Sequence, residues 1–169
     1  MRLVYLIRHA SPEIQPSVPS PEWVLSDRGQ REAGVLAGTA EGWGIEALYA
    51  STEPKAQGTA LIVGDALGLG VNVVPAFDEL RIPPEWIANS DEFNEMVRDI
   101  LTGDPPRGCE SAQAASARFA EGVALVAQGR LPAAVVSHGR VLTAYLSRHF
   151  GVSEPFDYWR SIPMPGWTV

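Results

Sequence analysis

The chain has 169 residues, a net charge of −7 and a hydrophobic fraction of 46%. This length suits one domain with a substantial core, so we expect residues 1–169 to form a single domain. Because 20 acidic residues outnumber 13 basic ones, nucleic acid is not an expected partner. The one cysteine excludes an internal disulfide, and no apolar run approaches the roughly 18 residues that span a bilayer. We therefore expect no membrane role and a cytoplasmic location.

Two patterns of apolar residues predict the order of the strands and helices. Short apolar runs indicate buried strands, and apolar residues three or four positions apart indicate helices that face a core. In chain order we expect a strand at 3–7, a proline-rich loop, a helix capped by Ser26, a strand at 47–50, a helix at about 53–67, a strand at 71–74, helices at about 90–101 and 110–128, a strand at 133–136 and a helix that includes 141–146. This alternation predicts an α/β fold with three α/β/α layers and a mostly parallel central sheet.

Two segments lack a clear period and are expected to shape a pocket. The loop 13–23 follows the first strand, and the segment 78–106 follows the third. We expect the second segment to cover a crevice at the strand ends, where Trp86 can contact a substrate. Substrate specificity is expected to come from these two segments.

Two of the predicted strands end in a histidine. His9 follows Arg8 at the end of the first strand, and His138 precedes Gly139 and Arg140 after the last. An open α/β sheet places reactive groups in the crevice outside the carboxyl ends of its strands, so we expect one shared site. Imidazole supplies a nucleophile or a proton carrier, and guanidinium matches phosphate oxygens. The combination predicts phosphoryl chemistry.

Five motifs in a fixed order carry a family resemblance. They are Leu6-Ile-Arg-His-Ala10, Leu25-Ser-Asp-Arg-Gly29, Tyr49-Ala-Ser51 with Thr59-Ala60, Gly108-Cys-Glu-Ser111 and Val136-Ser-His-Gly139. In order and spacing they resemble the signatures of the histidine phosphatase superfamily, which includes cofactor-dependent phosphoglycerate mutases and many small phosphatases. The resemblance covers residues 3–151 and implies a phosphoglycerate mutase-like fold.

The resemblance implies a two-step phosphoryl transfer that uses no metal and no other cofactor. The histidine matching His9 attacks phosphorus and holds the phosphoryl group covalently until water releases it. Arg8 binds the non-bridging oxygens, and His138 hydrogen-bonds the same group in the transition state. Gly139 belongs to the expected phosphate-binding set, and Ser11 is either a further phosphate donor or a turn residue.

A carboxylic acid after the third strand protonates the leaving alkoxide in the family. Glu79 matches this position through an apolar-x-Glu pattern and is the expected proton donor. A second alignment takes Leu80 as the apolar residue and places Ile82 at the position of the acid. In that alignment Asp78, Glu79 or Glu85 would have to substitute.

The clearest departure from the family lies at Lys55. The family has a second phosphate-binding arginine at this position, four residues before the threonine matched by Thr59. Lysine is a point charge without the bidentate fork of arginine. Lys55 therefore either neutralises phosphate or is a solvated lysine on a helix surface.

The expected function is a metal-independent phosphatase that acts on a small phosphomonoester or a phosphorylated protein side chain. A phosphoglycerate mutase is an alternative, although mutases use longer insertions than this chain has. A weakly active phosphate-binding regulatory domain is another alternative, suggested by Lys55. We expect His149 to be a cation at the C-terminus of a helix and Cys109 to be an inert thiol.

Overall fold

The computed structural model describes residues 3–169 and contains one five-stranded sheet with the order β3-β2-β4-β1-β5. The strands are β1 (Val4–Arg8), β2 (Ala47–Ala50), β3 (Val71–Val73), β4 (Ala133–Ser137) and β5 (Gly166–Thr168). Four of them run parallel, and β5 pairs with β1 in the antiparallel direction at the edge. The predicted mostly parallel sheet is confirmed.

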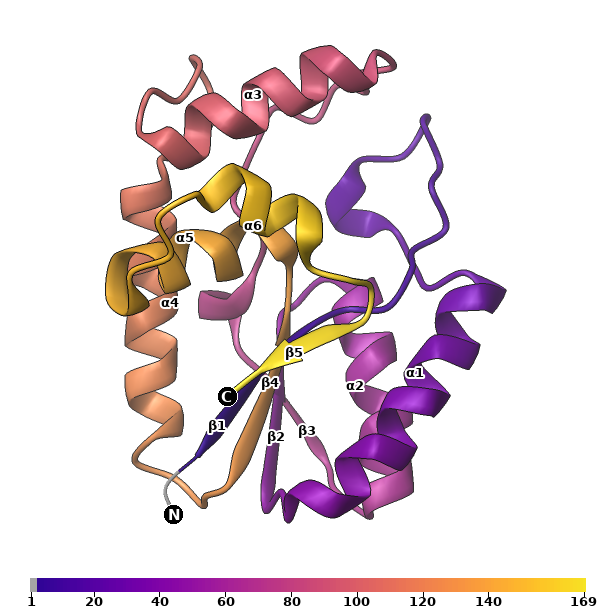
Figure 1. The fold of residues 1–169 in the computed structure, drawn as a ribbon. Helices are drawn as coiled ribbons and strands as arrows, with labels where there is room; N and C mark the ends of the chain where they lie inside the picture. Colours follow the sequence, from indigo (N-terminus) through magenta and orange to yellow (C-terminus); the bar gives the residue numbers. More distant parts are fainter. Residues whose placement is uncertain (1–2) are drawn as a thin grey trace.

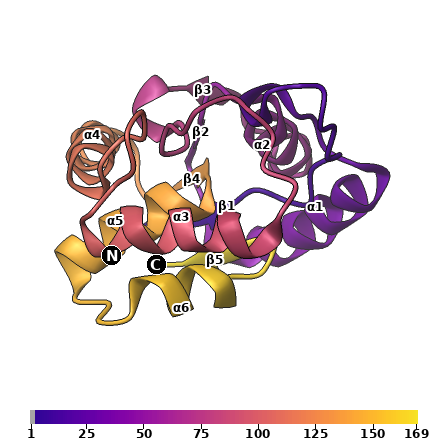
Figure 2. The ribbon, with the colours of Figure 1, turned by 90° about the horizontal axis from the view of Figure 1, so that it is seen from above.

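Helices cover both faces of this sheet. They are α1 (Asp27–Ala40), α2 (Pro54–Leu67), α3 (Ser90–Thr102), α4 (Ala112–Val126), α5 (Gly139–Phe150) and α6 (Pro155–Ser161), with short 3-10 helices at Ser20–Glu22, Glu41–Trp43 and Pro75–Phe77. Figure 1 shows α1 and α2 on one face and α4 and α5 on the other. Seen from above in Figure 2, α3 crosses the end of the sheet where β1 and β4 finish. No helix within residues 3–169 is long and apolar enough to span a membrane.

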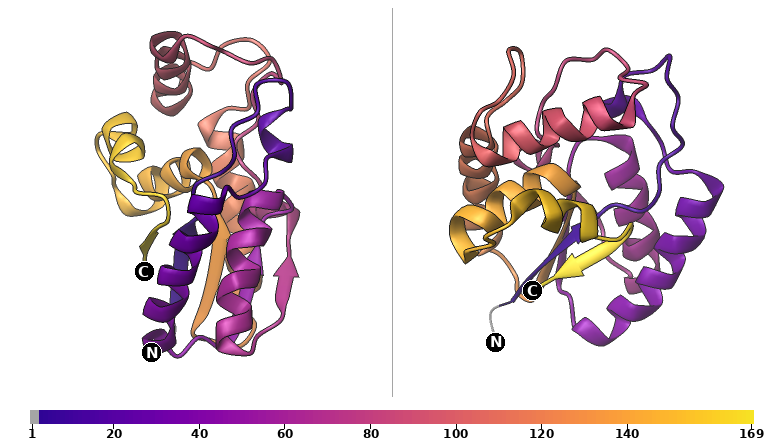
Figure 3. Two further views of the ribbon diagram at one scale, coloured as in Figure 1. Left: turned by 90° about the vertical axis from the view of Figure 1, so that its right-hand side faces the viewer. Right: turned by 45° about the horizontal axis from the view of Figure 1, so that its top comes forward.

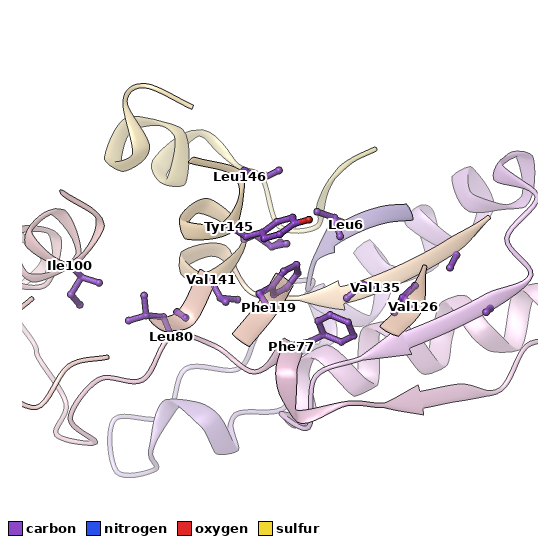
Figure 4. Packing of buried hydrophobic residues seen from close by; sticks show 14 residues of the cluster. Leu6, Phe77, Leu80, Ile100, Phe119, Val126, Val135, Val141, Tyr145 and Leu146 are labelled. Atoms are coloured by element: carbon purple, nitrogen blue, oxygen red, sulfur yellow. The ribbon is translucent and has the colours of Figure 1, made fainter. Parts of the chain in front are cut away.

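The sheet has a separate core on each face because successive strand residues point in opposite directions. Leu6 of β1 and Val135 of β4 pack with α4 and α5, in the cluster that Figure 4 shows. Their neighbours Ile7 and Val136 pack against α1 and α2. Burial on both faces explains why these strands are apolar runs without alternating polar residues. This packing on both sides also holds the ends of the two strands in place.

The start of α1 is joined to the loop that follows β1. Ser26 caps the helix by accepting a hydrogen bond from Gly29 N at 3.0 Å, and its own hydroxyl donates to Ser11 O at 3.0 Å. A Cβ at Gly29 would lie 2.0 Å from Ser11 O, so only glycine allows this approach. The predicted cap is confirmed, and it fixes the chain just beyond the candidate site.

The C-terminal α6 and β5 were not predicted, whereas the other helices and strands are confirmed with small shifts at their ends. Figure 3 shows this C-terminal segment returning along β1. Both elements are short, and α6 begins at Pro155 immediately after a loop. A three-residue strand has too few positions to show an alternating pattern.

Candidate active site

The carboxyl ends of β1 and β4 place His9 and His138 side by side. The two strands are adjacent and parallel, and the pairing continues past β1 because His9 N donates to Ser137 O at 2.9 Å. The imidazole rings meet edge to face with their centroids 5.0 Å apart. The predicted meeting of the two histidines in one site is confirmed.

The ring of His9 is held in one tautomer by the backbone. Its Nδ1 lies 2.7 Å from Ala10 O; because a carbonyl only accepts, Nδ1 carries the proton and Nε2 the lone pair. Ala10 N donates in turn to Thr59 Oγ1 at 3.0 Å, which holds this turn in place. Burial lowers the pKa of His9 to about 4. At neutral pH the ring is therefore uncharged, and no hydrogen bond from residues 3–169 occupies Nε2.

Ser51, which follows β2, fixes the ring of His138. Its hydroxyl donates to Asp78 Oδ1 at 2.9 Å and accepts from Glu53 N at 3.0 Å. One lone pair remains on the hydroxyl, so it accepts the proton of His138 Nε2, 2.8 Å away. The lone pair of His138 is then on Nδ1, which is buried and has no partner in the described chain. Burial and the neighbouring His9 hold the pKa of His138 well below its usual value, so this ring is also neutral.

Arg8 and Arg140 bring two guanidinium groups to the histidine pair. Arg8 Nη1 donates to Ile162 O at 2.6 Å, and Arg140 Nε lies 3.3 Å from Glu79 Oε2. Even so, Arg8 Nε and Arg140 Nη1 are buried without a partner in the described residues. Unpaired buried polar atoms are rare in folded proteins and call for a ligand or water. We refer to Arg8 Nε, Arg140 Nη1 and His138 Nδ1 together as the anion site.

Gly139 provides the space in which the Arg8 side chain approaches α5. A Cβ at this position would lie 3.0 Å from Arg8 Nε and 3.1 Å from Trp159 Nε1. These distances are tighter than ordinary contacts, so a side chain here would displace the guanidinium. Gly139 therefore lies against Arg8, where the absence of a side chain leaves room for the guanidinium.

Glu79 lies beside the site, but its surroundings oppose the predicted role of proton donor. Its carboxylate accepts from Leu80 N at 2.8 Å, Val141 N at 2.9 Å and Arg140 N at 3.2 Å. Burial acts to raise its pKa, yet Arg140 and these amides outweigh burial and lower the pKa below its usual value. In this arrangement Glu79 holds Arg140 and the first turn of α5, and its lowered pKa favours the ionised form.

The substitutes that the second alignment offered are not better placed. Asp78 accepts from Ser51 Oγ, from Thr52 N at 2.7 Å and from Thr52 Oγ1 at 2.8 Å, which binds both carboxylate oxygens. Glu85 is exposed. Ile82 has no titratable group.

Glu53 is the site residue that sequence reasoning missed. It is buried at the start of α2, with Oε1 3.7 Å from His138 Nε2 and 2.9 Å from Glu79 N. Burial raises the pKa of Glu53 although Lys55 acts to lower it. A signal was present in the sequence, because Glu53 interrupts the family motif two residues before Lys55. Glu53 and Glu79 therefore have opposite pKa shifts within one site.

Lys55 is buried, so the alternative of a solvated surface lysine is wrong. Only 3% of the residue is exposed. Its ammonium donates to Ser20 O at 2.7 Å and to Glu53 Oε2 at 2.5 Å. Its charge still acts on His9 and His138, whose pKa values it helps to lower. Lys55 thus belongs to the site while its hydrogen bonds are made to the protein.

Ser11 does not join the anion site. Its backbone N donates to Glu32 Oε2 at 3.1 Å, and its carbonyl accepts from Ser26 N at 3.1 Å. The Ser11 side chain also hydrogen-bonds Glu32 and helps to lower the pKa of that carboxyl group. These contacts favour the alternative in which Ser11 is a turn residue.

A cavity of about 830 Å³ opens against Glu53, Glu79 and Arg140. Its walls come mainly from residues 14–23 and 75–93, which overlap the two segments, 13–23 and 78–106, that were expected to shape a pocket. Trp86, the residue expected to contact a substrate, is among the lining residues. Cys109 and His149 lie outside the lining, and burial raises the pKa of the Cys109 thiol, in line with an inert cysteine.

The fold and the site together place the protein in one class of α/β proteins, in which two adjacent parallel strands each end in a histidine. The sequence profile of the histidine phosphatase superfamily (branch 1) matches residues 4–168, and the chain belongs to this superfamily. A protein of Yersinia enterocolitica named probable phosphoglycerate mutase is 31% identical over 170 residues, which cover 90% of this chain and 76% of that protein.

Solved structures share the fold across nearly the whole chain. A mycobacterial glucosyl-3-phosphoglycerate phosphatase aligns with a TM-score of 0.78 at 21% identity, covering 99% of this chain and 88% of the other. A mutant phosphoserine phosphatase from Entamoeba histolytica, solved with phosphoserine, gives 0.76 at 19% identity, covering 98% and 88%. A structure named mycobacterial hydrolase 1 gives 0.81 at 19% identity, covering 99% and 88%. These likenesses show that the fold is that of phosphoglycerate mutase-like histidine phosphatases.

Proposed function

We propose that the protein is a metal-independent phosphatase that hydrolyses phosphomonoesters through a covalent intermediate on His9. One observation carries the proposal: a neutral His9 contacts the ring of His138, and within residues 3–169 the anion site offers three buried nitrogen atoms without partners. A nucleophile and an anion site at the same place are what phosphoryl transfer requires.

In the first step His9 Nε2 attacks phosphorus, and the bond from phosphorus to the ester oxygen breaks. Arg8 and Arg140 bind the non-bridging oxygens and stabilise the charge on them. His138 Nδ1 takes up a proton as the anion arrives, because a nearby negative charge raises the pKa of an imidazole. It then donates a hydrogen bond to a phosphoryl oxygen.

Glu53 is assigned as the proton donor to the departing alkoxide. It is the carboxylic acid at the site whose pKa is raised, and it lies on the wall of the cavity. In the second step its carboxylate takes a proton from water, which attacks the phosphohistidine and releases inorganic phosphate. His9 and the protonated Glu53 are then restored. Glu79 acts by positioning Arg140.

The mutase alternative has one observation in its favour, the 31% identity to a protein named probable phosphoglycerate mutase. A glycerate substrate also needs a cation for its carboxylate. The cavity's other arginines, Arg81 and Arg118, are both paired with Glu110. We therefore favour the hydrolase, and conversion of 3-phosphoglycerate to 2-phosphoglycerate without phosphate release would favour the mutase.

Release of phosphate from p-nitrophenyl phosphate tests the function. Wild-type protein should turn over this ester, and His9→Ala should lose at least about 10³-fold in kcat/KM because the nucleophile is gone. The exposed His149, on the last turn of α5, gives the matched control His149→Ala, which should keep full activity. An inactive wild type that still binds phosphate would identify a binding domain instead.

A further inference from the structure

We infer that the alcohol part of the substrate is an apolar body, alkyl or aryl, and that it occupies the cavity beside the anion site. This inference rests on the proposed phosphatase function and narrows its substrate class. It sets the protein apart from enzymes whose substrates are phosphorylated sugars or glycerates.

The cavity walls are apolar side chains from two distant parts of the chain. The rings of Trp23 and Trp86 meet with their centroids 5.9 Å apart. Trp23 Nε1 donates to Val18 O at 2.9 Å and to Gln15 O at 3.1 Å, so its polar atom is used by its own loop. The remaining apolar lining includes Ile14, Val18, Ile82 and Ile87. A ligand therefore meets aromatic and aliphatic surface on both sides.

Two further arginines on the same walls, Arg81 and Arg118, are already paired. Arg118 donates to Ala76 O and Asp78 O, each at 2.9 Å, and lies 3.0 Å from Glu110. Arg81 lies 3.4 Å from the same carboxylate. The carboxylate of a glycerate would have to compete with these contacts to pair with either arginine. Since a site that cannot pair a buried polar group rejects it, the walls favour an apolar alcohol.

Arg140 is the residue shared by the anion site and the cavity wall, whose lining does not include Arg8, His9 or His138. This residue lines the cavity and also supplies one of the unpartnered nitrogen atoms. Its guanidinium carbon lies 5.9 Å from the ring centroid of Phe93, another wall residue. Glu53, the assigned proton donor, lines the cavity too. A phosphoryl group bound by Arg140 would thus have its ester oxygen toward Glu53 and its organic part against the apolar wall that includes the two tryptophans.

Calorimetric titration with alkylphosphonates tests the inference, because these probes carry the anion and an apolar chain but cannot be hydrolysed. Octylphosphonate should bind wild-type protein at least about 100-fold more tightly than methylphosphonate, since it has seven more methylenes and each buried methylene adds roughly twofold to fourfold. Glucose 6-phosphate and 3-phosphoglycerate should bind no more tightly than methylphosphonate. A preference for either of these, or equal affinity for the two alkylphosphonates, would overturn the inference.

Trp86→Ala is the informative variant, and Trp167→Ala is its matched control. The two tryptophans are similarly exposed, 46% and 49%, but Trp167 lies on β5 and outside the cavity lining. Trp86→Ala should weaken the binding of octylphosphonate about tenfold and leave the affinity for methylphosphonate within twofold of wild type. Trp167→Ala should change neither affinity. Equal losses for both probes in Trp86→Ala would contradict the assignment of the wall.

Hydrolysis of p-nitrophenyl phosphate, measured in parallel, separates this inference from the proposed function. Turnover without any effect of chain length would reject the apolar substrate and retain the phosphatase. A clear effect of chain length without turnover would reject the phosphatase and retain the apolar site.

Discussion

Glu53 and Glu79 lie in hydrogen-bond contact through a backbone amide, yet their surroundings drive their acidities in opposite directions. Burial dominates at Glu53 and raises its pKa. At Glu79, Arg140 and three amides outweigh burial and lower it. Titratable groups whose environments separate their pKa values mark acid and base roles in active sites. The roles proposed for the two residues use this difference, whereas the sequence motif pointed to Glu79 as the proton donor.

Paired amide substitutions test these two roles. Glu53→Gln should slow hydrolysis of alkyl phosphates by about 10²- to 10⁴-fold and of p-nitrophenyl phosphate far less, because p-nitrophenolate leaves without a proton. Glu79→Gln should slow both esters to a similar extent, because it loosens Arg140. Steady-state kinetics on the two esters decides the matter, and a loss confined to alkyl esters in Glu79→Gln would return the proton donor to Glu79.

Removing the charge of Lys55 should shift the pH dependence of activity. Glu53 must be protonated to act, so activity falls as pH rises through its pKa. The charge of Lys55 lowers that pKa; Lys55→Met should therefore move the alkaline limb of kcat/KM upward by about 1 to 3 pH units. Lys55→Arg keeps the charge and should leave the limb nearly in place. An alkaline limb that does not respond to Lys55→Met would argue that another group supplies the proton.

At the scale of the elements, the first turn of α5 controls the anion site through Gly139. Gly139→Ala should push the Arg8 guanidinium away by a few tenths of an ångström and raise the inhibition constant of inorganic phosphate about threefold to tenfold. Gly34→Ala is the control, since a Cβ at this position in α1 meets nothing within 4 Å. It should leave inhibition unchanged and stabilise the helix by about 0.5 to 1 kcal/mol. Equal inhibition constants for Gly139→Ala and wild type would place Arg8 outside the phosphate contacts.

The strands that carry the histidines could be predicted from sequence because each is a short run of mostly apolar residues. The strand before His9 and the strand before His138 are buried on both faces, and their ends follow from where the apolar run stops. The elements that complete the site could not be predicted in the same way. Ile162 O, which binds Arg8, and Trp159, which packs near Gly139, come from the short C-terminal segment. Their role depends on long-range packing that leaves no local period.

Side-chain partners were likewise beyond the sequence. The spacing placed Lys55 near the site but did not show that Glu53 takes up one of its hydrogen bonds. Ser11 follows the nucleophile closely enough to suggest a phosphate contact. In the structure its backbone is instead hydrogen-bonded to Glu32 and to Ser26, the cap of α1. In both cases the competing partner comes from a contact that only the folded chain reveals.

For the whole molecule, two buried neutral histidines make stability depend on pH. The pKa of His9 falls from its unfolded value near 6.5 to about 4 on folding. Between these values the unfolded chain binds more protons, so stability is complete above pH 6.5 and is lost as pH falls toward 4. His9 alone should cost about 2 kcal/mol between pH 7 and pH 5.

Urea unfolding at pH 7 and pH 5 measures this effect. His9→Asn removes the titrating ring and should reduce the acid-induced loss by about 2 kcal/mol, whereas the exposed His149→Asn should not alter it. The same pH dependence in His9→Asn and wild type would show that His9 is not buried as a neutral ring.

The central claim is that His9 carries the phosphoryl group during turnover, and mass spectrometry of the quenched enzyme tests it most directly. The protein is mixed with p-nitrophenyl phosphate, stopped in base within the first turnovers and digested. We expect an added phosphoryl group on the peptide that contains His9, stable in base and lost in acid, and none on the peptides with His138 or His149. A phosphoryl group on another residue, or an enzyme that turns over with His9 unmodified and equally well as His9→Ala, would contradict the account.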